Sequence, residues 1–180
     1  FIAADFLSQA EHGADSQAML VTSAESIVSP VVDAIQQQLS ELSRKDITAK
    51  ALEHSRIIVL KDEQEVIAFT NMYAPEHLII QTENYAHIAE QIENAGSVFM
   101  GPYTPESAGD YASGTNHTLP TNGYAKAYSG VNLDSFIKKI TFQEITAEGI
   151  KNLGGTIQTM AGNEQLDAHR NAVTIRLKTI

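Results

Sequence analysis

The feature that most constrains the fold is a repeated order of short apolar runs and longer segments with helical spacing. Four apolar runs are long enough for strands, at residues 18–22, 57–60, 77–81 and 97–100. The second run, IIVL, has no polar alternation, which is typical of a strand covered on both faces. The segments between the runs are long enough for helices of about 10–15 residues. Strands that alternate with helices in this way predict βαβ units and a parallel sheet.

Helices are predicted where apolar residues recur at three- and four-residue spacing behind a capping residue. Asp46 is expected to cap a short helix that ends near residue 53. Asp62 is expected to cap the next helix, because Glu65 stands at the spacing of a capping box. Further helices are predicted at residues 1–12, from residue 23 or 24 onward, and at 83–94.

The pattern changes after Val131. Residues 136–143 are predicted as a strand or a short helix, 147–160 and 164–171 as helices, and 172–177 (AVTIRL) as a half-exposed strand. The expected fold class is therefore α/β, with a parallel-sheet, Rossmann-like body at residues 1–131 and a small, mainly helical C-terminal domain at 132–180. Because Phe1 opens what reads as a helix already under way, we expect the body to be incomplete, with an N-terminal part absent.

Composition limits the classes of function. The chain has 180 residues, with 12 basic against 22 acidic side chains and a formal net charge of −10, so its field disfavours nucleic acids and anionic membranes. No apolar stretch approaches the roughly 20 residues of a membrane span. Cysteine is absent, which leaves His, carboxylate and amide groups as the metal ligands available. We expect an acidic cytoplasmic protein.

Reactive side chains are concentrated between residues 75 and 120. Glu76 and His77 follow a proline, and a neighbouring acid and imidazole can divide general-acid and general-base duties near neutral pH. The alternative is that Glu76 is an ordinary solvated loop acid and His77 simply the first residue of a strand. The run 101–120, which is rich in glycine and follows an apolar strand, offers Asp110 as a metal ligand and His117 as a ligand or substrate anchor.

Candidate residues also stand near the two ends of the chain. Gln9 and His12 are three apart in the first predicted helix and would share a face, although such a helix could simply expose both. Glu164 and His169 are five apart and share a site only if Glu164 starts its helix. His12 and His169, near opposite ends of the chain, suggest a metal site or proton-transfer site that is assembled from both ends of the sequence. No dinucleotide-binding glycine fingerprint is present.

Several segments together resemble the histidinol dehydrogenase family. They are FIAADFLSQAEH, NMYAPEHLII, AGSVFMGPYTPESAGDYASGTNHTLPTNGYA and AHRNAVTIRL, and they stand in the family's order. The resemblance covers essentially the whole chain but only the C-terminal part of the family's protein. It implies that the residues that hold NAD lie upstream of Phe1, so none is expected here.

The resemblance also implies roles for individual residues. One zinc ion would be held by Gln9, His12, Asp110 and His169. Glu76 and His77 would be the catalytic acid/base pair. The substrate pocket would be formed by the four zinc ligands together with His77, His117 and Glu164. In the family the tail of one subunit completes the site of its partner, which implies a homodimer.

The implied reaction is the oxidation of L-histidinol through L-histidinal to L-histidine, with reduction of two NAD molecules. The chain alone is expected to be inactive, since the NAD-binding part is absent. Two alternatives remain open from the residues. One is a zinc hydrolase in which Glu76 polarises a metal-bound water. The other is a non-catalytic dimerisation module whose apolar tail pairs two chains.

Overall fold

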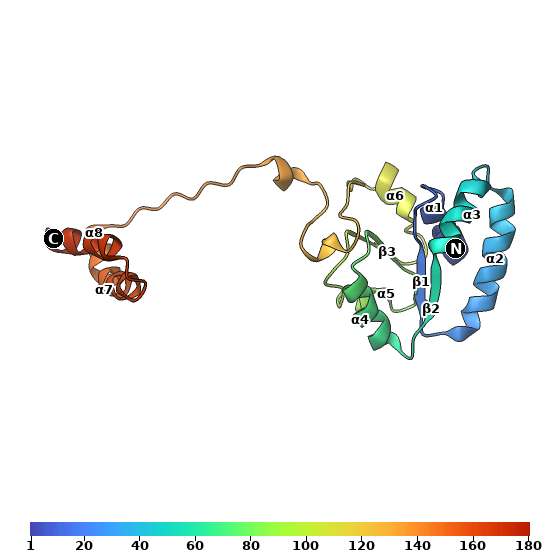
Figure 1. The fold of residues 1–180 in the computed structure, drawn as a ribbon, viewed down its shortest axis with the longest axis horizontal. Helices are drawn as coiled ribbons and strands as arrows, with labels where there is room; N and C mark the ends of the chain where they lie inside the picture. The colour runs from blue at the N-terminus through green and yellow to red at the C-terminus, as the bar shows by residue number, and fades with distance from the viewer. The chain divides into compact units, whose positions relative to one another are not determined.

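The structure is a computed structural model that describes residues 1–180 and divides into two compact units, 1–137 and 138–180 (Figure 1). The boundary predicted after Val131 lies a few residues before the division seen in the structure.

The first half of unit 1 is a parallel strand pair with three helices. In chain order the elements are α1 (Ile2–Ala10), β1 (Met19–Thr22), the 3-10 turn η1 (Glu25–Ile27), α2 (Val28–Glu41), α3 (Lys45–His54) and β2 (Arg56–Val59) (Figure 1). β1 and β2 run parallel, with Leu20 opposite Ile57. The helical crossover between the two strands is the βαβ arrangement that the alternation of apolar runs predicted.

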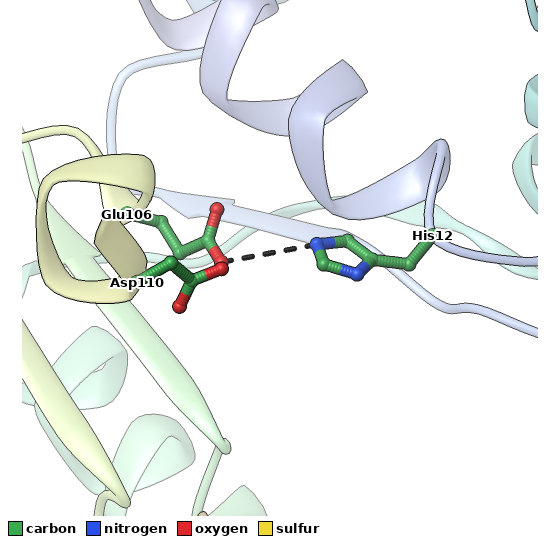
Figure 2. Close-up of side chains that lie close together, drawn as sticks. All are labelled: His12, Glu106 and Asp110. Carbon is green, nitrogen blue, oxygen red and sulfur yellow. Dashed lines mark ion pairs between the residues drawn. The ribbon is translucent and has the colours of Figure 1, made fainter. Parts of the chain in front are cut away.

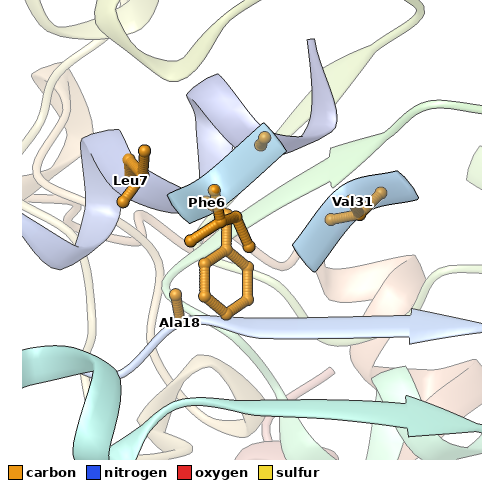
Figure 3. Close-up of a cluster of buried hydrophobic side chains, with 6 residues drawn as sticks. Phe6, Leu7, Ala18 and Val31 are labelled. Carbon is orange, nitrogen blue, oxygen red and sulfur yellow. The ribbon is translucent and has the colours of Figure 1, made fainter. Parts of the chain in front are cut away.

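A compact apolar cluster holds α1 and α2 against the start of β1. Its buried members are Ala3, Phe6, Leu7, Ala18, Val31 and Ile35 (Figure 3). Their spacing of three and four residues on each helix is why both helices form an apolar stripe that can face the same core. Burial of the Phe, Leu, Val and Ile side chains among them stabilises the fold by roughly 1.5–3 kcal/mol each. α1, which carries one wall of the candidate site, is therefore rigidly anchored.

The second half of unit 1 repeats the pattern with α4 (Glu63–Tyr73), β3 (His77–Ile80), α5 (Tyr85–Ala89) and β4 (Ser97–Met100). β3 and β4 are parallel, with His77 opposite Ser97. Asp62 caps α4 by accepting a hydrogen bond from the backbone N–H of Glu65, as predicted. The Glu65 carboxylate in turn accepts from the backbone N–H of Lys61. Buried Ile67, Ile80 and Ile88 form the core of this half.

Beyond β4 the chain carries short elements only: α6 (Glu106–Tyr111), η2 (Tyr124–Lys126) and η3 (Leu133–Phe136). Unit 2 consists of α7 (Ala147–Asn163) and α8 (Asp167–Leu177). These two helices pack closely, since a Cβ added at Gly154 would lie 2.8 Å from Leu177 Cδ1. The Gln158 side-chain amide also donates to the Thr174 hydroxyl across 2.6 Å. No helix is long and apolar enough to cross a membrane.

The prediction of an α/β fold with parallel strands is confirmed, but the strands form two separate pairs, β1–β2 and β3–β4, instead of one sheet. The reading of IIVL as a buried strand is wrong along its whole length, because Val59 is 44% exposed and Ile57, Ile58 and Leu60 are only half-buried. Asp46 does not cap α3, which begins one residue before it. The helix predicted at 83–94 is regular only over α5.

Two predictions for the tail are wrong. Residues 172–177 belong to α8, and the segment after η3 up to residue 143 has no regular secondary structure. The six-residue alternation in AVTIRL was too short to distinguish the two-residue period of a strand from the roughly 3.6-residue period of a helix. Val173 is buried while Ile175 is 54% exposed, so these apolar side chains do not share a strand face. Val173 and Leu177, four residues apart, instead face α7 at helical spacing.

Candidate active site

A polar cavity of about 280 Å³ lies in unit 1. It is lined by Gln9, His12, Ser16, Gln17, Glu76, His77, Asp110 and His117. Six of these eight are residues that the sequence analysis singled out, and they come from four separate segments of the chain. A second hollow, of about 360 Å³, is lined by residues between Thr118 and Val131 and contains no carboxylate or imidazole. The first cavity is therefore the one that can support chemistry.

Each wall of the cavity is set by a local feature of the chain. Gln9 lies in the last turn of α1, whereas His12 follows the end of the helix, so the two do not share a helical face as predicted. The turn after the helix nevertheless brings His12 to the same cavity. Glu76 precedes β3 and His77 is its first residue. Since β3 runs parallel to β4, this pair reaches the cavity from the amino end of its strand.

The α6 helix brings acidic side chains over the sheet to that end. A Cβ added at Gly109 would lie 2.7 Å from the ring of Phe99 on β4, so only glycine allows this close an approach. The Phe99 ring lies 6.0 Å from the His77 ring, centroid to centroid. α6 therefore folds back across Phe99 instead of staying at the carboxyl end of β4. This return places Asp110 beside His77.

The cavity has an acidic residue behind its wall that sequence reasoning gave no role. Glu106 is 2% exposed, and its Oε1 lies 3.8 Å from His12 Nε2 and 3.7 Å from His77 Nε2. Figure 2 shows Glu106 and Asp110 pointing from one face of α6 toward His12. Their four-residue separation was the one signal in the sequence, because residues four apart on a helix share a face.

Three buried polar atoms at this site have no hydrogen-bond partner: Gln9 Nε2, His77 Nε2 and Glu106 Oε1. Leaving a buried polar group unpaired costs about 1–3 kcal/mol. Such groups are rare in native proteins and concentrate where a ligand or ion is bound. Their convergence makes this cavity the candidate functional site.

Burial and neighbouring charges shift three pKa values here. Burial raises the pKa of Glu76, and the effects of His12 and Asp110 on it oppose one another. Burial lowers the pKa of His77, against a smaller effect of Asp110. Burial, reinforced by Asp110, raises the pKa of Glu106 from 4.5 to about 7. An acid and an imidazole shifted in these directions are suited to proton transfer near neutral pH.

A family model for histidinol dehydrogenase matches residues 1–177 of the chain. The chain belongs to the histidinol dehydrogenase family. The histidinol dehydrogenase of Bacteroides thetaiotaomicron is 64% identical over the whole chain, and that of Aliivibrio fischeri is 54% identical. The chain spans 42% and 41% of their lengths, respectively. The resemblance read from the sequence segments is thus confirmed.

A solved structure gives the same result for the fold. The crystal structure of histidinol dehydrogenase from Elizabethkingia anophelis matches 99% of this chain with a TM-score of 0.93 and 58% sequence identity. The match covers 41% of that longer chain. The α/β arrangement described above is therefore a fold of the histidinol dehydrogenase family.

The residues of the cavity fit a metal ion. Ligand atoms of His12 and Asp110 lie within 4.8 Å of each other and of an oxygen of Glu106, which is buried behind the cavity wall. Imidazole nitrogen and carboxylate oxygen are donors that zinc accepts. Gln9 adds a buried amide whose nitrogen has no hydrogen-bond partner. The unpaired atoms and the chemistry of the donors thus fit a metal ion in unit 1.

Glu164 and His169 belong to unit 2. Glu164 is the residue that ends α7. It therefore does not start the next helix, which was the condition for Glu164 and His169 to share a site on one helix. His169 lies in the first turn of α8. Both side chains are exposed.

The raised pKa of Glu106 predicts a pH-dependent stability. A carboxyl group whose pKa is raised on folding makes the folded state bind more protons, so stability falls as pH rises from about 4.5 to about 7. We expect Glu106→Gln to remove this fall and to stabilise the metal-free chain at pH 8 by about 1–3 kcal/mol. Urea unfolding with a chelator at pH 5 and pH 8 measures the effect.

The matched control is Glu53→Gln, at an exposed position on α3. It removes one carboxylate from the chain without touching the cavity. An identical pH dependence in Glu106→Gln and in the parent would show that Glu106 does not carry this destabilisation.

Proposed function

We propose that the chain is the C-terminal part of a zinc-dependent histidinol dehydrogenase that oxidises L-histidinol through L-histidinal to L-histidine with two NAD molecules. The observation that carries this proposal is the convergence of six polar residues from four segments on one cavity, in a chain of this family. The small polar cavity is compatible with an amino alcohol that carries an imidazole.

We assign zinc to Gln9, His12 and Asp110 in the cavity, with His169 as the fourth ligand. When bound, the ion would hold and orient the imidazole and amine of the substrate. His117 and Glu164 are proposed to contact the substrate, together with the zinc ligands and His77. The all-nitrogen and oxygen donor set agrees with a chain that has no cysteine.

The two catalytic residues are Glu76 and His77. The lowered pKa of His77 keeps its imidazole neutral at physiological pH, so it can accept the hydroxyl proton of histidinol as hydride passes to NAD. Glu76, adjacent to it, then removes a proton from the water that adds to the aldehyde. Loss of a second hydride from the hydrate to another NAD gives the carboxylate. Each oxidation thus releases one NADH.

We propose that NAD is held by a region upstream of Phe1 in the full-length protein. The chain carries no glycine fingerprint for a dinucleotide, and its relatives are more than twice as long. The chain alone should therefore be inactive as a dehydrogenase. In keeping with a biosynthetic role, we propose a cytoplasmic location and no nucleic-acid or membrane partner.

The partner that the chain suggests is a second copy of itself. Between residues 124 and 145 large apolar side chains are exposed, including Tyr128 at 65%, Phe136 at 79% and Phe142 at 91%. A run of exposed apolar side chains along the chain is typical of a segment that is covered in an assembly. We propose a homodimer in which the α7–α8 unit brings Glu164 and His169 to the site of the partner.

The proposed function is tested by an assay of NADH formation in the full-length protein. We expect two NADH per L-histidinol, loss of activity after chelation and recovery on addition of zinc. Residues 1–180 alone should bind metal weakly and form no NADH. A zinc hydrolase would instead show metal-dependent hydrolysis without NAD, and a dimerisation module would be indifferent to the chelator.

A further inference from the structure

The cavity's eight lining residues do not include the one side chain that lies near most of them. Glu106 is buried beneath the cavity, close to both His12 and His77 and next to Asp110 on α6. It therefore stands between the proposed metal ligands on one side and the proposed base on the other.

The unpaired atoms around Glu106 are chemically complementary. Gln9 Nε2 can only donate a hydrogen bond, ionised Glu106 Oε1 can only accept, and His77 Nε2 can do either. A small shift that closes the 3.7 Å gap between Glu106 and His77 would give a bond of normal length. The Gln9 amide is also close enough to Glu106 to lower the pKa of its carboxyl group. One carboxylate can thus satisfy all three atoms.

We propose that Glu106 is a positioning residue that accepts hydrogen bonds from Gln9 Nε2 and from His77 Nε2–H. This inference rests on the proposed function for the identity of the metal and of the base. The hydrogen bond to Glu106 directs the Gln9 side-chain oxygen toward the metal, because an amide that donates with its nitrogen presents its oxygen on the other side. Glu106 also fixes the His77 tautomer with the proton on Nε2, which leaves Nδ1 as the proton acceptor. Carboxylates that orient metal ligands and imidazoles in this way are a common second layer of metal sites.

The tautomer is measured directly on the unaltered chain. Nitrogen-15 NMR of the histidine side chains at pH 8 distinguishes protonation at Nε2 from protonation at Nδ1. We expect the Nε2–H form of His77 to predominate in the parent and to lose its predominance in Glu106→Gln. Predominance of the Nδ1–H form in the parent would overturn the assignment.

Metal affinity gives a second readout that does not need turnover. In the full-length protein we expect Glu106→Gln to weaken zinc binding by about 10–100-fold in a competition titration, whereas Glu53→Gln should leave the zinc affinity unchanged. In the full-length enzyme, Glu106→Gln should lower kcat without changing the KM for NAD. Unfolding curves of the metal-free variants verify that both are folded.

The outcomes separate the inference from the proposed function. If the parent binds zinc and produces NADH but Glu106→Gln matches it in zinc affinity and in the His77 tautomer, the positioning role is wrong and the function stands. If the full-length parent neither binds zinc nor oxidises histidinol while the His77 tautomer depends on Glu106, the function is wrong and the contact to His77 stands.

Discussion

Glu76→Gln is expected to lower the turnover of the full-length enzyme by about 10²–10⁴-fold, the usual contribution of a well-placed general base. The amide keeps the shape of the carboxyl group but cannot accept a proton. Glu76 is not among the proposed zinc ligands, so zinc content and the affinity for histidinol should stay close to the parental values. Burial raises the pKa of Glu76, which strengthens its carboxylate as a base.

The measurement is steady-state NADH formation, started once from L-histidinol and once from L-histidinal. A base for the hydration of the aldehyde should be needed most in the second reaction. Glu53→Gln serves as the control for the loss of one negative charge. Parental rates from both substrates would remove Glu76 from the catalytic machinery.

Local patterns in the sequence predicted much of the fold because strand and helix periods are local properties. The four apolar runs became β1 to β4, and Asp62 caps α4 as expected. Pairing is not local: nothing within the runs shows that β2 and β3 would not join. The strand predicted at 172–177 was wrong for the same reason. Six residues could not distinguish a strand period from a helix period, and the burial of Val173 in the α7–α8 unit favoured the helix.

The sequence drew attention to six of the residues that line the cavity, but not to how they are arranged. Pro-Glu-His and the loop after β4 stood out in the sequence. The role of Glu106 did not, because its burial depends on α6 folding back over Phe99 at Gly109. A glycine in that helix signals a close approach only when the partner is known. Contacts that form because the chain folds back on itself cannot be predicted from the spacing of residues in the sequence.

Stability and function oppose one another at Glu106. As a buried carboxyl group with a raised pKa it destabilises the metal-free chain, and as a hydrogen-bond acceptor it is expected to strengthen the metal site. Replacement by Gln should therefore raise stability and lower zinc affinity in the same protein. Opposite signs of this kind are typical of functional sites, where unpaired polar groups are retained for binding.

Mixing two inactive variants is expected to restore about a quarter of the parental activity if tails are exchanged in a homodimer. One variant is Glu76→Gln, with its defect in unit 1, and the other is His169→Ala, with its defect in unit 2. In a mixed dimer one site combines both defects. The other combines an intact unit 1 with an intact partner tail. Half of the dimers are mixed after random exchange, which leaves about a quarter of all sites intact.

The matched control is a mixture of Glu76→Gln with Asp110→Asn. Both defects lie in unit 1, so every site of every dimer carries one of them and no activity should return. Each variant is produced with its own affinity tag, the two are unfolded and refolded together, and NADH formation is measured first on the mixture and then on the isolated mixed dimer, where about half of the parental activity is expected because one of its two sites is intact. If the Glu76→Gln and His169→Ala dimer forms but stays as inactive as its parents, His169 serves the site of its own chain. Recovery in that mixture alone would show that the α7–α8 unit completes the site of the partner, because no arrangement within one chain can regenerate an intact set of residues from these two defects.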